Sequence, residues 1–287
     1  MLKYFNSKYE IFKFSREEHP IIKQNIVLHL AGKAHDIKNT SNAQEYYNVN
    51  TELTKKIFDS FLNSSAQVFI TLSSVKAVAD VLESELTEEY IPNPITHYGK
   101  SKLLAEQYIL SKEIPIGKRI YILRPAMIHG PGNKGNLNLL YKIVNLGFPW
   151  PLGAFENKRS FCSIENLCFV IRELIENDVI LSGIYNIADD EAISTNQLIN
   201  IIATSQNKRA IIYKIPSKII FILAKIGDLL KLPFNTERLK KLTENYIVSN
   251  QKLKNAISKS LPISSNNGLF KTLVSFSIND TEIKQTQ

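Results

Sequence analysis

The chain has 287 residues, 44% hydrophobic and 22% charged, a composition typical of a globular protein with a core large enough for one large domain or two unequal ones. Its net charge of +8 comes from scattered basic residues, and the sequence has no recognisable DNA- or RNA-binding motif, so we predict no nucleic-acid partner and consider an anionic small substrate instead. The two cysteines, Cys162 and Cys168, have no zinc-site spacing and predict packing residues in a reducing compartment, the cytoplasm.

Strands and helices are predicted to alternate through the first half of the chain. In chain order, hydrophobic patterning predicts a strand over Lys8–Ser15, a buried strand over Asn25–Gly32, a helix over Ala43–Ser65, a buried strand over Gln67–Ser74, a helix over Asn93–Glu113 and a strand with a turn over Lys118–Asn133. This alternation is typical of an α/β fold with a parallel sheet, in which ligands bind beyond the carboxyl ends of the strands.

Tyr98 and Lys102 lie four residues apart in the second predicted helix and therefore share one helix face. They are either a solvent-facing pair or a proton-transfer pair, in which the cation lowers the pKa of the phenol. Because Ser73 and Ser74 end the preceding strand, we expect a hydroxyl, the phenol and the ammonium to converge at one edge of the sheet.

A later stretch, Ile215–Pro233, is the most apolar of the chain, but charged residues, among them Lys218, Lys225 and Asp228, interrupt it. It is too short a clean run to span a bilayer, and we predict no membrane span. The spacing predicts an amphipathic helix that is buried or faces a partner, with a membrane-surface helix as the alternative.

Six motifs follow one another along the chain: VLHLAG, YNVNTEL, ITLSSVKAV, HYGKSKLLAE, LRPAMIHGPGNKGN and NKRSF. Together, over roughly residues 9–200, they resemble the extended short-chain dehydrogenase/reductase family, and within it the nucleotide-sugar epimerases and reductases of the NAD-dependent epimerase/dehydratase type. The resemblance implies a Rossmann-like, doubly wound parallel sheet with a smaller C-terminal substrate domain. The dinucleotide-binding domain would span 1–128 with 161–182, and the substrate lobe 129–160 with 183–287.

The resemblance also implies the chemistry, a hydride transfer at a sugar carbon, usually C4, to and from NAD or NADP. Tyr98 would be the general acid or base on a sugar hydroxyl, its pKa lowered by Lys102 and by the positive nicotinamide. Lys102 would also bind the nicotinamide ribose, and Ser74 would orient the sugar oxygen. An epimerase returns the hydride to the other face of the sugar, whereas a reductase takes it from a fresh reduced cofactor.

Further cofactor contacts are implied by position. Ala31 and Gly32 would line the cofactor because they are small, and Pro125 would meet the nicotinamide carboxamide. Asn50 would support the network around the cofactor. Arg16 stands where an acidic residue binds the adenosine ribose, which favours the 2′-phosphate of NADP.

Three residues are implied substrate contacts. Arg159 would bind the nucleotide diphosphate, with a surface cation as the alternative, and Asn136 would contact substrate near the same phosphates. Lys76 would either reach the sugar or face water. Because Val75 and Lys76 follow Ser74 where dehydratases of the family carry an acidic pair, dehydration is disfavoured.

No metal site is predicted, because His29 and His35 lack the further metal-ligating neighbours that such a site needs. We interpret His129 as a packing residue.

The sequence departs from the family in its first part, since it has no G-x-x-G-x-x-G turn to bind the pyrophosphate. The strands over Lys8–Ser15 and Asn25–Gly32 should then pair directly or expose their edges. We interpret Met1 as an internal methionine of a longer reading frame or the start of a truncated gene, and expect this chain to bind a dinucleotide poorly.

The leading hypothesis is an NAD(P)-dependent 4-epimerase or 4-keto reductase of UDP-sugars for surface-glycan synthesis, with a homodimer as a possible assembly. One alternative is a dehydrogenase of the same family that acts on a sterol or flavanone alcohol. The other is a catalytically silent, cofactor-free binding or scaffold protein, or a fragment of the enzyme. The missing glycine turn favours the silent protein, and the retained Ser74, Tyr98 and Lys102 oppose it.

Overall fold

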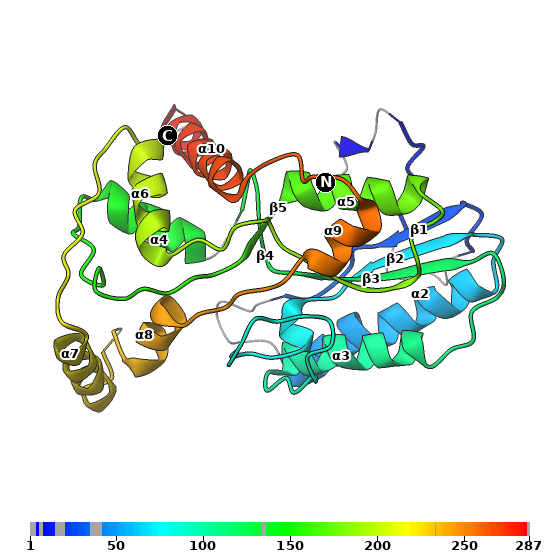
Figure 1. The fold of residues 1–287 in the computed structure, drawn as a ribbon, viewed down its shortest axis with the longest axis horizontal. Helices are drawn as coiled ribbons and strands as arrows, with labels where there is room; N and C mark the ends of the chain where they lie inside the picture. Colours follow the sequence, from blue (N-terminus) through cyan, green and yellow to red (C-terminus); the bar gives the residue numbers. More distant parts are fainter. Residues whose placement is uncertain are drawn as a thin grey trace.

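The computed structural model combines an α/β part, built on a parallel sheet, with a second part that is mainly helical (Figure 1). It describes residues 4–5, 8–14, 21–34, 42–133, 136–232 and 234–285, without the side chains of Asn136 and of residues 277–285. Within these ranges, no helix has both the length and the apolar character needed to cross a bilayer.

The main sheet has four parallel strands in the order β1 (Ile26–His29), β2 (Val68–Leu72), β3 (Arg119–Pro125) and β6 (Gly183–Ile187). In the central register Ile70 pairs with Leu28 on one side and with Tyr121 on the other. Strands β2 and β3 are almost wholly buried, as expected for apolar runs covered on both faces, and the predicted α/β class with a parallel sheet is confirmed. Strand β6 pairs with β3, although the predicted substrate lobe included residues 183–187.

The predicted strand over Lys8–Ser15 is wrong for its described part, since residues 8–14 form no strand. The segment packs against α5 (Ile164–Glu176) instead, where Tyr9 Oη and Lys8 Nζ both donate to the Glu176 carboxylate. Among the described strands β1 is therefore an edge, which is the second of the two expected outcomes, and residues 8–14 do not pair with it. A short alternating run of residues specifies which side is apolar but not the element that covers it. Here that side packs against a helix rather than pairing as a strand.

Helices cover both faces of the sheet (Figure 1). One face carries α2 (Leu53–Leu62) and α3 (His97–Leu110), where Phe58, Phe61 and Phe69 form an aromatic cluster. The other carries α5 and α9 (Gln251–Ile257). The helix predicted over Ala43–Ser65 is present in three consecutive parts: α1 (Ala43–Tyr46), the π-helical η2 (Tyr47–Glu52) and α2.

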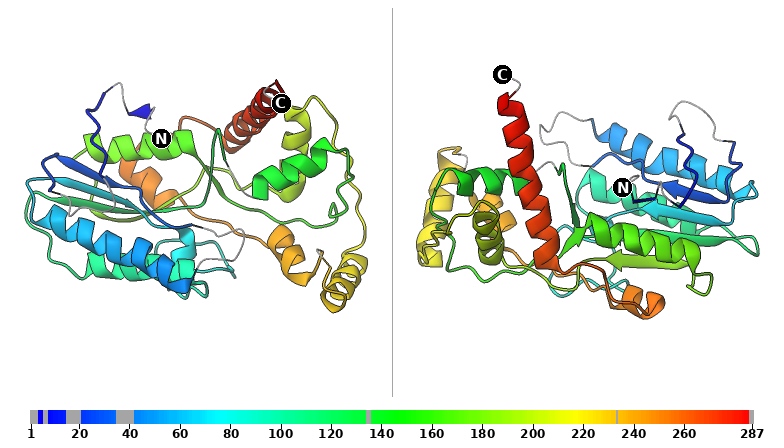
Figure 2. Two further views of the ribbon diagram at one scale, coloured as in Figure 1. Left: turned by 180° about the vertical axis from the view of Figure 1, so that it is seen from behind. Right: turned by 90° about the horizontal axis from the view of Figure 1, so that it is seen from above.

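The second part has its own core and lies beside the sheet in both views of Figure 2. It contains the pair β4 (Met127–His129) and β5 (Phe161–Ser163), and the helices α4 (Asn136–Asn145), α6 (Thr195–Ser205), α7 (Ser217–Leu229), α8 (Thr236–Thr243) and α10 (Ser265–Gln285). The helix predicted within Ile215–Pro233 is present as α7, which lies with α8 at the end remote from the sheet. Cys162 and Cys168 are buried free thiols, as predicted.

Candidate active site

The first turn of α3 lies directly against the backbone that follows β2. Thr96 caps the helix by accepting a hydrogen bond from the Gly99 amide at 3.2 Å, and the Asp80 carboxylate accepts from the Ile95 amide at 2.7 Å. A Cβ on Gly99 would lie 2.3 Å from the carbonyl oxygen of Lys76, in the short 3₁₀ turn η3 (Val75–Ala77). Only a residue without a side chain permits this approach, which brings α3 beside Ser74.

Lys102 is buried on α3, and its ammonium donates to the Leu72 carbonyl oxygen at 2.8 Å, at the carboxyl end of β2. Gly32, in the segment after β1, lies so close to Lys102 that a Cβ there would be 3.0 Å from Lys102 Nζ. Burial lowers the pKa of Lys102 to about 8, against the opposing effect of Glu106, which lies one helical turn further on. The same burial, with the charge of Lys102, lowers the pKa of His29 to about 4, so this histidine is neutral at pH 7.

Tyr98 and Ser74 are joined by a side-chain hydrogen bond. Burial raises the pKa of Tyr98, and the Ser74 bond lowers it by a smaller amount. The structure thus differs from the expected net lowering of this pKa. The reason is that desolvation of the phenolate outweighs the stabilising contact, while the Lys102 ammonium is directed to the Leu72 carbonyl.

Asn50 lies wholly buried in η2 and links three elements. Its Oδ1 accepts from the Lys33 amide at 2.8 Å, and its Nδ2 donates to the Lys33 carbonyl and to Ser101 Oγ, each at 3.0 Å. Ser101 Oγ in turn donates to the Tyr98 carbonyl at 2.8 Å. Asn50 therefore ties the segment after β1 to α3, which is the work of a positioning residue.

A buried ion pair between Glu106 and Arg124 lies beside the site and was not predicted from the sequence. Glu106 receives hydrogen bonds from Arg124 at 2.6–3.2 Å and a short one from Ser73 Oγ. Both charged side chains are at most 3% exposed. Glu106 follows Lys102 by four residues, so the helical spacing carried a signal, but the Arg124 partner is remote in sequence.

Lys76 and Arg159 form a basic cluster at the seam between the two parts. Lys76 Nζ donates to the Asp80 carbonyl at 2.8 Å and lies 3.9 Å from the centre of the Tyr246 ring. Burial, together with the nearby charge of Arg159, lowers the pKa of Lys76 to about 8, against the opposing effect of Asp80. Arg159 is half-buried and donates to the Lys241 carbonyl.

The remaining predicted residues are placed as follows. Ala31 follows β1 beside Gly32, and Pro125 is the buried last residue of β3. Asn136 begins α4, but its side chain is outside the described part, as is the whole of Arg16. His129 is buried, 2.9 Å from Thr272 Oγ1 and 3.4 Å from Asp189, which confirms that it is a packing residue. Over the described ranges no His, Cys, Asp and Glu side chains cluster as a metal site would require.

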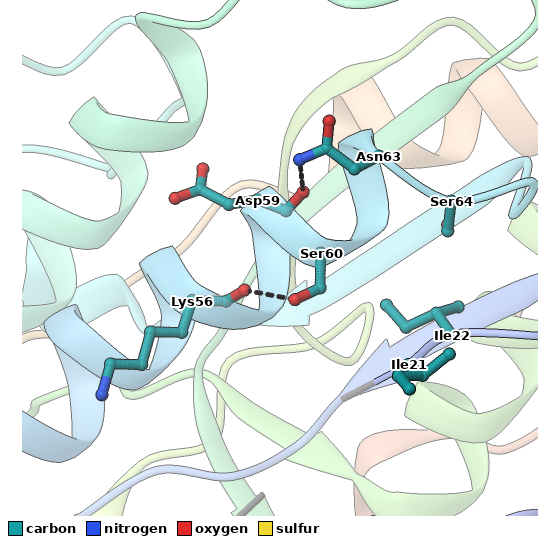
Figure 3. A pocket seen from close by; sticks show the side chains of 7 residues that line it. All are labelled: Ile21, Ile22, Lys56, Asp59, Ser60, Asn63 and Ser64. Atoms are coloured by element: carbon teal, nitrogen blue, oxygen red, sulfur yellow. Dashed lines mark hydrogen bonds between the residues drawn. The ribbon is translucent and has the colours of Figure 1, made fainter. Parts of the chain in front are cut away.

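An open hollow of about 420 Å³ lies at the opposite end of the sheet, between the segment before β1 and the last turns of α2 (Figure 3). Two of its polar side chains bond to their own helix, Ser60 to the Lys56 carbonyl and Asn63 to the Asp59 carbonyl, each at 2.9 Å, and the Asp59 carboxylate accepts from Tyr108 Oη of α3 at 2.8 Å. It has no acid–base pair comparable with Tyr98 and Lys102, so the candidate site is the one at the carboxyl ends of β1 and β2.

Residues 15–188 match the model of the NAD dependent epimerase/dehydratase family. The chain belongs to this family.

Two curated relatives of the chain are 4-epimerases by name. It is 29% identical to the UDP-glucose 4-epimerase of Vibrio cholerae over 67% of the chain and 60% of the relative. It is 30% identical to the N-acetyl-alpha-D-glucosaminyl-diphospho-ditrans,octacis-undecaprenol 4-epimerase of Escherichia coli O157:H7 over 67% of the chain and 56% of the relative. The chain thus spans less than two thirds of the length of either.

The fold is also that of solved structures. The UDP-N-acetylglucosamine 4-epimerase from Bacillus cereus superposes with a TM-score of 0.67 at 19% identity, covering 89% of this chain and 80% of the other. The same score and coverage, at 16% identity, hold for MoeE5 in complex with UDP-glucose and NAD. The Rossmann-like fold expected of an epimerase/dehydratase family member is confirmed.

The residues at the ends of β1 and β2 fit the nicotinamide end of a dinucleotide. Lys102 presents a buried ammonium with three donor hydrogens, of which one donates to Leu72. Gly32 leaves beside it a space that a Cβ would fill. These are groups suited to ribose hydroxyls and to a close approach of backbone and cofactor.

We expect the buried Lys102 to make stability depend on pH. The unfolded lysine holds its proton to about pH 10.5, whereas the folded one releases it near pH 8, so the free energy of unfolding rises between these values, by about 3 kcal/mol. Lys102→Met should remove this part of the slope, as measured by urea unfolding across the interval. Lys100→Met, an exposed lysine of the same helix, is the control and should keep it. An unchanged slope in Lys102→Met would contradict the assignment.

Proposed function

We propose that this chain is an NAD(P)-dependent 4-epimerase or 4-keto reductase of nucleotide sugars, with a UDP-sugar as substrate in surface-glycan synthesis. The observation that carries the proposal is the convergence of the Ser74–Tyr98 hydrogen bond, the buried Lys102 ammonium and Gly32 at the carboxyl ends of β1 and β2. The 4-epimerase names of the two relatives support the reaction class.

The dinucleotide, when bound, supplies the acceptor and donor of the hydride. Lys102 would donate to its ribose, and Ala31, Gly32 and Pro125 would line the nicotinamide end. Tyr98 Oη would take the proton of the sugar C4 hydroxyl and later return one to the same oxygen, while Ser74 Oγ holds that oxygen in place. The hydrogen bond with Ser74 opposes the effect of burial on the pKa of the phenol and holds Tyr98 Oη beside the Ser74 hydroxyl.

Lys76 and Arg159 would bind the diphosphate of the substrate. Two partly desolvated cations close together at the seam favour an anionic ligand, and such a ligand would relieve the mutual repulsion that lowers the pKa of Lys76. We place Asn136 near the same phosphates. A diphosphate is common to UDP-sugars and to the undecaprenol-linked sugar in the name of the Escherichia coli relative, so both substrate types belong in the test.

A second candidate is a binding protein without catalysis, favoured by the absence of a G-x-x-G-x-x-G sequence between Met1 and Gln287. A third is a dehydrogenase on a sterol. The chain is 27% identical to the sterol-4-alpha-carboxylate 3-dehydrogenase of Mus musculus over 67% of the chain and 55% of the relative.

We also propose a cytoplasmic location and a homodimer through α2 and α3. The homodimer is supported by the exposed side chains of Leu104 and Leu110 on α3.

The test is to denature the purified protein and measure by mass spectrometry the NAD(P)(H) released per protomer. We expect less than one equivalent of cofactor in the purified protein, because the sequence has no glycine turn to bind the pyrophosphate. When NAD is added in excess, we expect a UDP-sugar to be converted to its C4 epimer. When NADPH is added in excess, we expect a 4-keto sugar to be reduced to the alcohol. Stoichiometric NAD would mean that the glycine turn is dispensable and would favour the epimerase. Neither bound cofactor nor turnover after soaking in NAD and NADPH would favour the silent protein.

A further inference from the structure

Helix α7 presents an apolar stripe to solvent. Six side chains form the stripe, and each is between 44% and 82% exposed: Ile219, Ile222, Leu223, Ile226, Leu229 and Leu230. Their spacing of three, four and seven residues places them on one face of the helix. Single exposed apolar residues are ordinary, but a continuous face of this length marks a surface that binds something apolar.

The orientation of this face is fixed by the opposite side of the helix. Ile220, Ala224 and Gly227 are buried, and a Cβ on Gly227 would lie 1.8 Å from the carbonyl oxygen of Phe234. The ring of Phe221 meets that of Phe155 with centroids 5.9 Å apart. Rotating the helix to bury the stripe would break these contacts, so the stripe is a surface feature of the folded lobe.

The charges around the stripe are strongly positive. Between Lys208 and Glu244 there are nine lysines and arginines and three acidic residues, so this segment carries six of the eight net positive charges of the chain. Lys218 and Lys225 are exposed, seven residues apart and therefore next to one edge of the stripe. Neither takes part in a salt bridge with any described residue.

From this combination we propose that α7 docks the protein on the surface of an anionic lipid bilayer, with the stripe at the acyl boundary and the lysines among the headgroups. The helix has 13 residues, too few to span a hydrocarbon core of about 30 Å, and would lie in the plane of the interface. It is at the end of the molecule remote from the sheet, where a flat surface can reach it (Figure 1). A second copy of the chain is a poorer occupant, because a symmetric contact would bring two strongly basic segments together.

The test is cosedimentation with vesicles of phosphatidylcholine mixed with phosphatidylglycerol, and with vesicles of phosphatidylcholine alone. We expect binding to the anionic vesicles that weakens when salt is raised from about 0.1 M to about 1 M, since the Debye length falls from about 10 Å to about 3 Å. Ile222→Gln with Leu229→Gln should weaken binding by about ten- to a hundredfold, and Lys218→Gln with Lys225→Gln by about thirtyfold. All four positions are exposed, so a thermal melt should show the fold intact.

The matched control is Ile116→Gln with Leu181→Gln, which removes the same two residue types from exposed positions outside α7 and should bind like the wild type. Wild-type protein that stays in the supernatant with anionic vesicles would overturn the proposal, as would a stripe variant that binds as well as the wild type and the control. If the wild-type protein does not bind vesicles and is a dimer that the stripe variant converts to a monomer, the stripe binds a second copy of the chain instead. The assay needs no cofactor or sugar, so its result is independent of the proposed activity.

Discussion

Replacing Tyr98 with phenylalanine is expected to lower turnover of the sugar substrate by about 10²–10⁴-fold, the range typical of a lost general acid–base group. The substitution removes the only atom proposed to exchange a proton with the substrate oxygen and leaves the ring in place. The Ser74 hydroxyl loses its partner but keeps its bond from the Lys76 amide at 3.2 Å, so the strand end should stay folded. Steady-state rates with added NAD, together with a thermal melt, measure both effects.

Tyr108→Phe provides the control on the same helix, because the Tyr108 hydroxyl donates to Asp59 at 2.8 Å, away from the strand ends. It should cost some stability and leave the rate close to that of the wild type. If Tyr98→Phe kept its rate, or if both variants lost activity equally, the phenol of Tyr98 would not be the proton-transfer group.

Replacing Glu106 with alanine is expected to destabilise the fold by about 3–5 kcal/mol, because it leaves the Arg124 guanidinium buried without its counter-charge. The loss should be seen as a lower midpoint in urea unfolding. Activity should fall as well, since Ser73 loses its acceptor and Lys102 loses the carboxylate that opposes the effect of burial on its pKa.

The control for this variant is Glu237→Ala, which breaks the exposed pair with Lys241 and should cost no more than about 0.5 kcal/mol. The double change Glu106→Leu with Arg124→Met tests the mechanism, because it removes both charges and should be less destabilising than Glu106→Ala alone. The loss of stability in the double variant could instead equal the sum of the losses in Glu106→Leu alone and Arg124→Met alone. That result would show that the pair stabilises the fold through packing rather than through charge compensation.

Local patterns were sufficient to predict much of the fold. β2 and the first part of β3 are apolar runs, and α3 has a threonine cap and helical spacing, so their positions follow from interactions within a few residues. The strand expected over Lys8–Ser15 was wrong because its outcome depended on a distant competitor, α5, which a short alternating segment does not reveal.

The candidate site divides in the same way. Tyr98 and Lys102 were found from a four-residue spacing, and Ser74 from the end of a strand. The Glu106–Arg124 ion pair and the hydrogen bonds of Asn50 to Lys33 and Ser101 join segments that only the folded chain brings together. The direction of the Tyr98 pKa was also out of reach, because it depends on how fully the phenol is desolvated, a property of the surrounding packing rather than of sequence spacing.

The contact at Gly99 has an evolutionary consequence. The separation between the Tyr98 phenol and the Ser74 hydroxyl is set within the sheet and one helix turn, by backbone that has no room for a side chain, whereas Arg159 and α4 belong to the other lobe. If the proposed function holds, insertions or substitutions in that lobe would change which sugar is bound and leave the distance between Tyr98 and Ser74 unchanged. We therefore expect proteins that descend from such a chain to keep the proposed reaction and to differ in the substrate that they bind.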